Sequence, residues 1–345
     1  MKITHLIFSL NIGGSETMLV EILNHQIEHA EVNLIIVNES YKEELLNKID
    51  KRINVIFLKR KPHTRNLIDL FRITVLLIRL RSDVLHCHNH NLIPLIIIPS
   101  HRKKAVLTLH TMDIPIKYLN RYHKLFAISN SVKNNIMSRG QIDSIVIYNG
   151  VSTETIQTQE IQIVDTTFKI ICTSRLEHPH KGQHLAIKAI KLLKDRGISN
   201  IQLDLIGTGN SEKYLKDLTS KNGIENQVNF LGLKDRDYIY SHLKDYHLLI
   251  QPSLYEGFGL TVAEGMAAFI PVLISDIDGP MEIIENGKFG FYFKSNNFEN
   301  MAIKIQFIKD NINSELVEKI VKSAYQHVKE NFEISFTVSK YFQNY

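Results

Sequence analysis

The sequence predicts an α/β protein built from two Rossmann-like domains, and three observations support this fold class. Short apolar segments alternate with amphipathic segments along the chain, which is the pattern of parallel strands connected by helices. The alternation is interrupted once, by the polar stretch 152–167. The chain has 345 residues, which is long for a single core and suits two domains of about 150 to 170 residues each.

The first domain is expected to begin with a strand that ends at the glycine turn Gly13-Gly14. Short apolar runs predict its strands at 4–10, 32–37, 55–58, 84–86, 105–109, 124–128 and 144–148. Between them, 17–28 and 67–80 have the apolar spacing of amphipathic helices. We therefore place the N-terminal domain at 1–155.

The second domain repeats this alternation after the polar stretch. Its strands are predicted at 169–172, 202–206, 228–230, 247–250 and 272–274, and its helices at 184–195, 211–222, 298–307 and 315–331. We place this domain at 165–325 and a C-terminal helical segment at 326–345. In such sheets, ligands are expected at the carboxyl ends of the strands.

Composition limits the class of protein. An apolar content of 44% and a charged content of 22% are those of a soluble globular protein. The first residues predict a strand, not a signal peptide, and the longest apolar run, 92–99, is too short to span a bilayer. Two cysteines make no disulfide framework, so we expect a cytoplasmic protein.

The charge is distributed unevenly. Residues 1–150 contain 20 Lys/Arg and 12 Asp/Glu, a net +8, whereas residues 151–345 contain 21 and 24, a net −3. Arg65, Arg72 and Arg79 recur every seven residues, which predicts a basic face on the helix 67–80. This face could meet anionic lipid headgroups at the inner face of the membrane, or be a solvated stripe. Few aromatic residues lie among the basic ones, which argues against nucleic acid as a partner.

The segment 253–267 carries the most specific signal for function. Gly257-Phe258-Gly259 precedes a predicted helix that begins near Leu260-Thr261. Glycines allow close backbone approach, and a helix start favours negative charge, so this junction suits a diphosphate. Two carboxylates, Glu256 and Glu264, flank it. They would repel phosphates, but they can accept hydrogen bonds from sugar and ribose hydroxyls.

Two further turns follow predicted strands. Arg175 and Lys181 lie between the strand 169–172 and the next helix, where two cations could neutralise a leaving diphosphate. Gly13 and Gly14 open the helix 17–28, where backbone N–H groups could face a phosphate. The dinucleotide fingerprint Gly-x-Gly-x-x-Gly is absent here, which argues against a nicotinamide dehydrogenase.

No metal site is predicted. The run His86-Cys-His-Asn-His90 has alternating histidines but no convincing partner ligands, so we expect it to be a strand end lining the site, as we do for His110. Asp235-Arg-Asp237 and Asp276-Ile-Asp278 match a short metal-binding pattern that recurs by chance. We interpret the first as a helix cap and the second as a turn.

In their order along the chain, these segments resemble the family-four retaining glycosyltransferases of GT-B architecture, of the bacterial surface-polysaccharide type. The resemblance extends over nearly the whole chain. It is carried by Gly13-Gly-Ser-Glu16, His86 with His88, Leu107-Thr-Leu-His110, Ala127–Lys133, Tyr148-Asn-Gly-Val151, Ser174-Arg-Leu176, Lys181-Gly182, Leu205–Gly209, Val228–Gly232 and Glu256 with Glu264.

The resemblance implies two Rossmann-like domains facing across a cleft, with the C-terminal segment crossing back to the first domain. It also implies that Arg175 and Lys181 hold the donor diphosphate, aided by backbone at Gly14 and Leu260-Thr261. Glu256 would bind the transferred sugar and Glu264 the ribose, with His110 near the reacting face of the sugar. The segment after Gly232 would lie near the base.

We therefore expect a retaining transfer of a hexose or N-acetylhexosamine from a nucleotide sugar, most simply a UDP-sugar. The expected acceptor is a cell-envelope glycan or lipid-linked saccharide, and neither a cofactor nor a metal is expected. Two alternatives stay open: a GT-B sugar-nucleotide epimerase, which needs no acceptor, and a non-catalytic partner subunit. The chain departs from the family pattern at three places: Ser174 replaces a glycine, Thr111 follows His110 where an aspartate is usual, and Gly279-Pro280 follows the last strong strand.

Overall fold

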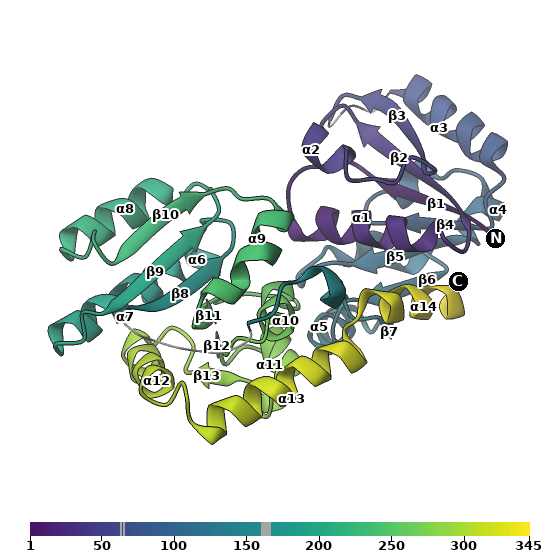
Figure 1. Cartoon of the computed structure of the whole chain (residues 1–345). Helices are drawn as coiled ribbons and strands as arrows, with labels where there is room; N and C mark the ends of the chain where they lie inside the picture. Colours follow the sequence, from purple (N-terminus) through teal and green to yellow (C-terminus); the bar gives the residue numbers. More distant parts are fainter. Residues whose placement is uncertain (63, 65, 160–166) are drawn as a thin grey trace. The chain divides into compact units, whose positions relative to one another are not determined.

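The computed structural model describes residues 1–62, 64, 66–159 and 167–345. The chain divides into two compact units: Met1–Gly150 with Ile334–Tyr345, and Val151–Glu333 (Figure 1). The predicted third segment began at 326, but the second unit keeps helix α13 (Glu315–Asn331), and the last helix, α14 (Ile334–Asn344), belongs to the first unit.

The first unit contains a seven-stranded parallel sheet in the order β3-β2-β1-β4-β5-β6-β7. Its strands are β1 (Lys2–Ile7), β2 (Glu31–Asn38), β3 (Asn54–Arg60), β4 (Val84–Cys87), β5 (Ala105–Leu109), β6 (Lys124–Ala127) and β7 (Ile145–Val146). Its α-helices are α1 (Gly14–Gln26), α2 (Glu43–Leu46), α3 (Leu67–Leu80), α4 (Pro99–Arg102), α5 (Asn130–Gly140) and α14. The strand order reverses between the neighbouring strands β1 and β4, where α/β sheets bind ligands.

The second unit repeats this plan with a six-stranded parallel sheet in the order β10-β9-β8-β11-β12-β13. Its strands are β8 (Phe168–Thr173), β9 (Ile201–Ile206), β10 (Val228–Gly232), β11 (Leu248–Gln251), β12 (Val272–Ser275) and β13 (Phe291–Phe293). Its α-helices are α6 (His178–Lys181), α7 (Gln183–Asp195), α8 (Glu212–Lys221), α9 (Arg236–His242), α10 (Leu260–Ala267), α11 (Asp278–Ile283), α12 (Phe298–Asp310) and α13. Here the order reverses between β8 and β11.

Most predicted elements lie within a few residues of their positions in the structure, and three assignments were wrong. The first strand ends at Ile7, and Leu10 instead forms an isolated bridge with Tyr41. The strand predicted at 144–148 is only the pair Ile145–Val146. The predicted turn at Asp276-Ile-Asp278 leads directly into helix α11, because a proline in a first helical turn needs no hydrogen-bond donor.

Helix α14 is attached to the first unit along its whole length. A Cβ on Gly150 would lie 2.5 Å from the Ile334 Cα, so only glycine allows this close approach. Thr337 Oγ1 donates to the Tyr148 carbonyl at 2.9 Å, and Lys124 Nζ donates to the Asn344 carbonyl at 2.6 Å. None of the described helices is both long and apolar enough to cross a bilayer.

Candidate active site

The residues predicted to bind the diphosphate lie on two adjacent loops of the second unit. One loop follows β8 and carries Arg175 and Lys181; the other follows β11 and carries Glu256 and Gly257–Gly259. Because β8 and β11 are neighbouring parallel strands at the switch point of the sheet, both loops emerge at the same edge. The fold therefore brings together two segments separated by about 75 residues, as in the Lys181–Glu256 pair.

Backbone contacts hold these two loops against each other. The backbone N–H groups of Leu254 and Tyr255 donate to the His180 carbonyl at 2.7 and 3.1 Å. Gly182 has a φ of +66°, and a Cβ there would lie 1.8 Å from the Pro252 carbonyl oxygen. Glycine is thus required at 182 both by the left-handed backbone and by the close contact.

Lys181 and Glu256, which were predicted to act on different parts of the donor, form an ion pair. Lys181 Nζ lies 2.6 Å from Glu256 Oε2, and the two side chains are 25% and 20% exposed. Each is therefore partly desolvated, yet open to solvent on one side. The pair fixes the position of the ammonium group, which has further N–H donors beyond the one that Glu256 accepts.

Arg175 lies on the same loop and is exposed. Its backbone carbonyl accepts from Gln183 Nε2 at 2.8 Å, and the same amide is 2.8 Å from Ser174 Oγ. The glycine that the family pattern places at 174 is therefore replaced by a residue whose hydroxyl joins the hydrogen bonds of the loop. A Cβ on Gly207 would lie 2.1 Å from the Ser174 carbonyl, so the loop is also packed closely against the segment after β9.

Helix α10 begins immediately after the Gly-Phe-Gly loop. Its N-cap, Gly259, has a φ of +102° and provides no side-chain cap, and no acidic residue occupies the first turn at Leu260 and Thr261. A helix start without a competing carboxylate favours an anion. Gln251 Nε2 donates to Thr261 Oγ1 at 2.9 Å and so attaches the helix start to the end of β11.

Glu264 lies one turn into α10 and is buried, 7% exposed. Its Oε1 lies 3.4 Å from Arg236 Nη2 and accepts from the Tyr240 hydroxyl at 3.2 Å. Both partners come from α9, the helix after β10, and Arg236 also donates to the Tyr240 hydroxyl. A cation and a phenol thus orient a buried carboxylate in which one oxygen, Oε1, receives both contacts.

Sequence reasoning missed Arg236 and Tyr240. The sequence around them, Asp235-Arg-Asp237, predicts only a helix cap or a chance match to a metal pattern. The cap is confirmed, because Asp235 Oδ1 accepts from the Tyr238 N–H at 2.8 Å. The expectation that the segment after Gly232 lies near the base pointed to this part of the chain, but it named no individual residue and no contact with Glu264.

In the first unit, Gly13 and Gly14 form the start of α1. Gly13 has extended backbone, and a Cβ there would lie 2.6 Å from the Glu16 carboxylate, which accepts from Ser15 Oγ. At Gly14, which is exposed, a Cβ would meet nothing within 4 Å. Among the described residues, none lies close enough to a Cβ at position 14 to require glycine there.

His110, directly after β5, is half-buried and is the first member of a chain of hydrogen-bonded histidines that continues to the buried His88 and His5. His110 Nε2 lies 3.1 Å from His88 Nδ1, His88 Nε2 lies 3.0 Å from His5 Nδ1, and His5 Nε2 lies 2.7 Å from Gln26 Oε1. Gln26 donates to the hydroxyl of Tyr345, the residue after α14, at 2.8 Å. Sequence reasoning identified His86, His88 and His110, but not His5, Gln26 or Tyr345.

The direction of this chain follows from its amide end. Gln26 Oε1 can only accept, so His5 must donate from Nε2 and accept at Nδ1. His88 must then donate from Nε2 to His5 Nδ1, and His110 must donate from Nε2 to His88 Nδ1. Both are therefore Nε2–H tautomers. Burial lowers the pKa of His5 and of His110 to about 4, and also lowers the pKa of His88, so all three are neutral at pH 7. His110 Nδ1, which has no hydrogen-bond partner among the described residues, is then an acceptor.

The same histidines include the one grouping among the described residues that is close enough to hold a metal ion. Ligand atoms of His5, His86 and His88 lie within 4.8 Å of one another. The nitrogens are engaged in other contacts, however: His86 Nδ1 and Nε2 lie 2.8 and 2.7 Å from the Tyr345 and Thr108 hydroxyls. We interpret the cluster as a hydrogen-bonded network.

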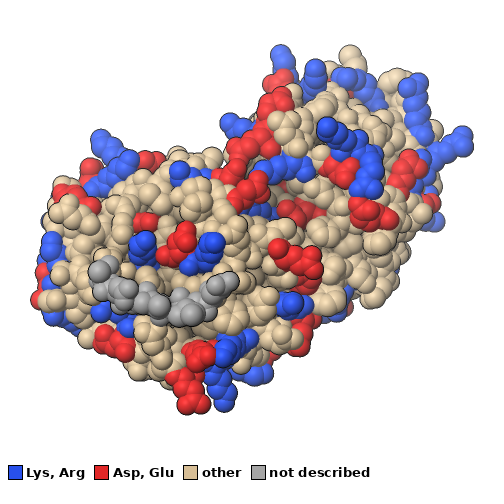
Figure 2. All heavy atoms as spheres, in the orientation of Figure 1, with Lys and Arg blue, Asp and Glu red and all other residues tan. Residues whose placement is uncertain are grey.

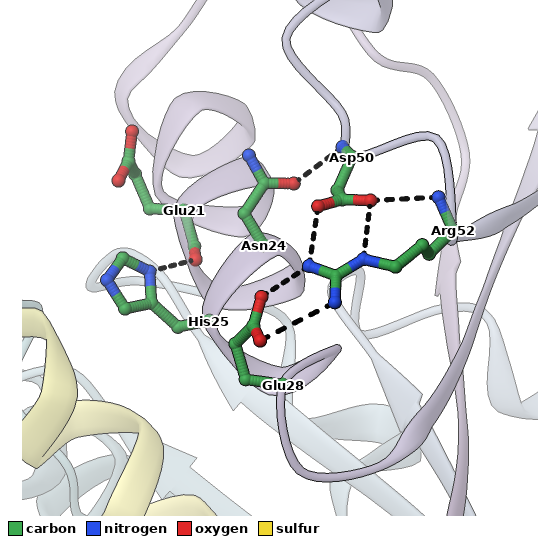
Figure 3. Close-up of polar contacts among 6 residues, drawn as sticks. All are labelled: Glu21, Asn24, His25, Glu28, Asp50 and Arg52. Atoms are coloured by element: carbon green, nitrogen blue, oxygen red, sulfur yellow. Dashed lines mark hydrogen bonds and ion pairs between the residues drawn. The ribbon is translucent and has the colours of Figure 1, made fainter.

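A groove of ≈ 430 Å³ lies elsewhere on the first unit, between α1 and α14. Its charged neighbours are paired with each other (Figure 3): Arg52 contacts Glu28 and lies 2.8 Å from Asp50 Oδ2. Arg52 lowers the pKa of Asp50 to about 2. These exposed contacts join the end of α1 to the turn before β3, and we assign the groove no catalytic role.

Comparisons with known proteins identify the family of the chain. The model of the glycosyl transferases group 1 matches residues 153–327, and that of glycosyltransferase family 4 matches residues 12–155. A glycosyltransferase of Methanocaldococcus jannaschii is 28% identical over 311 residues, 85% of this chain and 84% of the relative. The amylovoran biosynthesis glycosyltransferase AmsK of Erwinia amylovora is 26% identical over 219 residues, 58% of this chain and 53% of AmsK.

The fold matches solved structures over the full chain. HepE from Anabaena, crystallised with UDP and glucose, covers 100% of this chain and 99% of its own with a TM-score of 0.84 and 23% identity. A glycosyltransferase from Rickettsia africae gives a TM-score of 0.83 at 21% identity, covering 99% of this chain and 97% of its own. The chain, with its two parallel-sheet α/β domains, therefore has the GT-B fold, and it belongs to the glycosyl transferases group 1 family, with relatives in polysaccharide biosynthesis.

Proposed function

We propose that this glycosyltransferase transfers a hexose or N-acetylhexosamine from a UDP-sugar with retention of anomeric configuration. The acceptor in this proposal is a cell-envelope glycan or a lipid-linked saccharide at the cytoplasmic face of the membrane. The observation that carries the proposal is the Lys181–Glu256 ion pair beside a helix start that has no acidic residue in its first turn.

The second unit offers separate partners for each part of such a donor. Lys181, Arg175 and the N–H groups at Leu260-Thr261 suit the diphosphate, since fixed cations and a helix start both favour negative charge. Glu264, oriented by Arg236 and Tyr240, suits the ribose hydroxyls. Glu256 can accept from a sugar hydroxyl as well as from Lys181. The UDP in the HepE complexes supports the choice of nucleotide.

In the proposed reaction an acceptor hydroxyl attacks the anomeric carbon while the bond from that carbon to the β-phosphate oxygen breaks. The acceptor proton passes to the leaving phosphate on the same face, which gives retention without a covalent intermediate. Lys181, Arg175 and the start of α10 stabilise the charge that develops on the diphosphate. His110, with Nδ1 as an acceptor, suits a hydroxyl of the transferred sugar. We propose that no metal takes part.

Product analysis tests this proposal. The enzyme is incubated with UDP-glucose, UDP-galactose and their N-acetyl forms, with EDTA, with and without an envelope lipid-linked saccharide fraction. We expect acceptor-dependent release of UDP and a product whose new linkage keeps the anomeric configuration of the donor, as read by NMR. Inversion would contradict the retaining mechanism. Conversion of the donor to an epimer without acceptor would identify an epimerase instead.

A further inference from the structure

Helix α3 of the first unit is apolar on two sides. Ile73 and Leu77 are 1% and 2% exposed and form its buried side. Leu67, Phe71 and Ile78, by contrast, are 79%, 69% and 51% exposed. Spaced four and seven residues apart, about one and two turns, these three form a single row along the helix. A surface helix normally presents polar residues to water, so this row indicates a surface with an apolar partner.

A second row runs beside the first, one residue further along the chain. Ile68, Arg72 and Arg79 have the same spacing as the exposed apolar row, so they lie about 100° around the helix from it. Ile68 is 64% exposed and Arg79 is also exposed. Arg65, which we predicted on this basic face, lies outside the described residues.

The surroundings of α3 are basic as well. Residues 59–104 contain ten Lys/Arg and two Asp/Glu. Lys104 Nζ donates to the Ser82 carbonyl at 3.0 Å, which places the segment 102–104 beside the C-terminal end of α3. Figure 2 shows Lys and Arg side chains along the upper right of the first unit, where Figure 1 places α3. Arg72 Nη1 lies 3.9 Å from Asp69 Oδ1 and is half exposed, whereas among the described residues neither Arg79 nor the exposed Arg81 has a carboxylate within ion-pair distance.

We propose that the outer face of α3 is a docking surface for an anionic lipid bilayer, with Leu67, Phe71 and Ile78 inserted among the headgroups. Such insertion requires exposed large apolar side chains with cations beside them, and one sign of charge must dominate the area around them. All three conditions are met here. The long Arg72 and Arg79 side chains can reach headgroup phosphates while the apolar row lies deeper. This surface goes beyond the transfer reaction and does not depend on it.

Vesicle flotation of the full-length chain tests the surface without any sugar nucleotide, so its outcome is independent of the proposed reaction. The probes are vesicles of phosphatidylcholine alone and of phosphatidylcholine with phosphatidylglycerol. The variants are Phe71→Ser with Ile78→Ser, and Arg72→Gln with Arg79→Gln. Matched controls on the second unit are Ile303→Ser with Phe307→Ser, which are 51% and 41% exposed, and the exposed pair Lys213→Gln with Lys221→Gln.

We expect the wild type to bind the vesicles that contain phosphatidylglycerol but not those of phosphatidylcholine alone. This binding should weaken as the salt concentration is raised. The arginine variant should weaken binding about twentyfold, since each cation near an anionic surface contributes about fivefold. The serine variant should weaken binding about tenfold or more through lost apolar insertion. Both controls should bind as the wild type does, with unchanged melting temperatures.

Three results would overturn the proposal. One is absence of binding to phosphatidylglycerol vesicles. Another is that the control variants lose as much vesicle binding as the α3 variants do, which would show that the protein is attracted by its general charge and not through α3. The third is a wild-type oligomer, seen by analytical ultracentrifugation, that the serine variant dissociates; a second copy of the chain would then cover α3.

Discussion

Among single residues, Lys181 has the most specific arrangement. Its ammonium is fixed by Glu256 at 2.6 Å and remains partly exposed, so it can contact a second anion without a large rearrangement. Glu264 is the complementary case, a buried carboxylate whose orientation depends on Arg236 and Tyr240. In the proposed reaction, Lys181 would recognise the charge of the donor and Glu264 its hydroxyl groups.

Replacing Lys181 by alanine should therefore reduce turnover by about a hundredfold or more, because a fixed donor to a developing anion contributes about 3 to 4 kcal/mol. Steady-state kinetics with the acceptor measures this loss. Lys213→Ala, an exposed lysine on α8, is the control and should leave turnover unchanged. A Lys181→Ala enzyme with the wild-type rate would remove Lys181 from the mechanism.

The buried histidines make a second prediction at this scale. At pH 7, ¹⁵N-labelled His5, His88 and His110 should all be neutral Nε2–H tautomers, because Gln26 sets the direction of the chain. Nitrogen NMR distinguishes the two tautomers directly. In Gln26→Leu, His5 loses its acceptor and the tautomers should become mixed. An imidazolium signal at pH 7 in the wild type would contradict the network.

At the scale of elements, periodicity predicted the long amphipathic helices well. The bounds of α3 (Leu67–Leu80) and α13 (Glu315–Asn331) agree with the sequence prediction because both have a clear apolar stripe. Strand β13 (Phe291–Phe293) was missed because three residues at a sheet edge give too short a pattern. Helix α11 was missed because Gly279-Pro280 is also typical of a turn.

The candidate site, like the secondary structure, could be predicted from the sequence only where its residues form a local pattern. Glycines and charges on the loops after β8 and β11 are local signals, so Lys181, Glu256 and Glu264 could be found in sequence. Arg236 and Tyr240 reach Glu264 over 28 and 24 residues, and Tyr345 reaches His86 over 259. Such contacts depend on packing between distant elements and leave no local pattern.

The junction between α6 and α7 allows a direct test of the site architecture. In Gly182→Ala, the new Cβ would be attached to a left-handed backbone and would lie 1.8 Å from the Pro252 carbonyl oxygen. It should lower the free energy of unfolding by about 2 kcal/mol or more and weaken nucleotide binding. Gly197→Ala is a matched control, because its φ is +82° and a Cβ meets nothing within 4 Å. Equal effects of both variants in denaturant unfolding would show that the close contact is unimportant.

At the scale of the whole molecule, both units use one plan, a parallel sheet with a switch point between adjacent strands. They differ in what occupies that position: the histidine network after β4 and β5 in the first unit, and the charged loops after β8 and β11 in the second. The first unit is completed by α14 and the residue after it, Tyr345, which contacts both Gln26 and His86.

The first unit should consequently lose stability in acid. The pKa values of His5 and His110 are about 4 when folded, against 6.5 for an exposed histidine. The unfolded chain therefore binds more protons between these values, so stability is complete above pH 6.5 and falls towards pH 4. The loss per histidine approaches about 1.4 kcal/mol per pH unit. Hydrogen exchange of the β1 and β4 amides measures it; pH-independent protection would contradict the prediction.

In the proposed function, the second unit binds a uridine diphosphate sugar through Lys181 and Glu264. Titration calorimetry of the wild type against UDP, GDP and ADP, in EDTA, tests it most directly, with Lys181→Ala and Glu264→Ala alongside. We predict selective UDP binding that both variants weaken by about tenfold or more, as loss of a charge-assisted hydrogen bond implies. No binding of any nucleotide, or UDP binding that neither variant changes, would contradict the account.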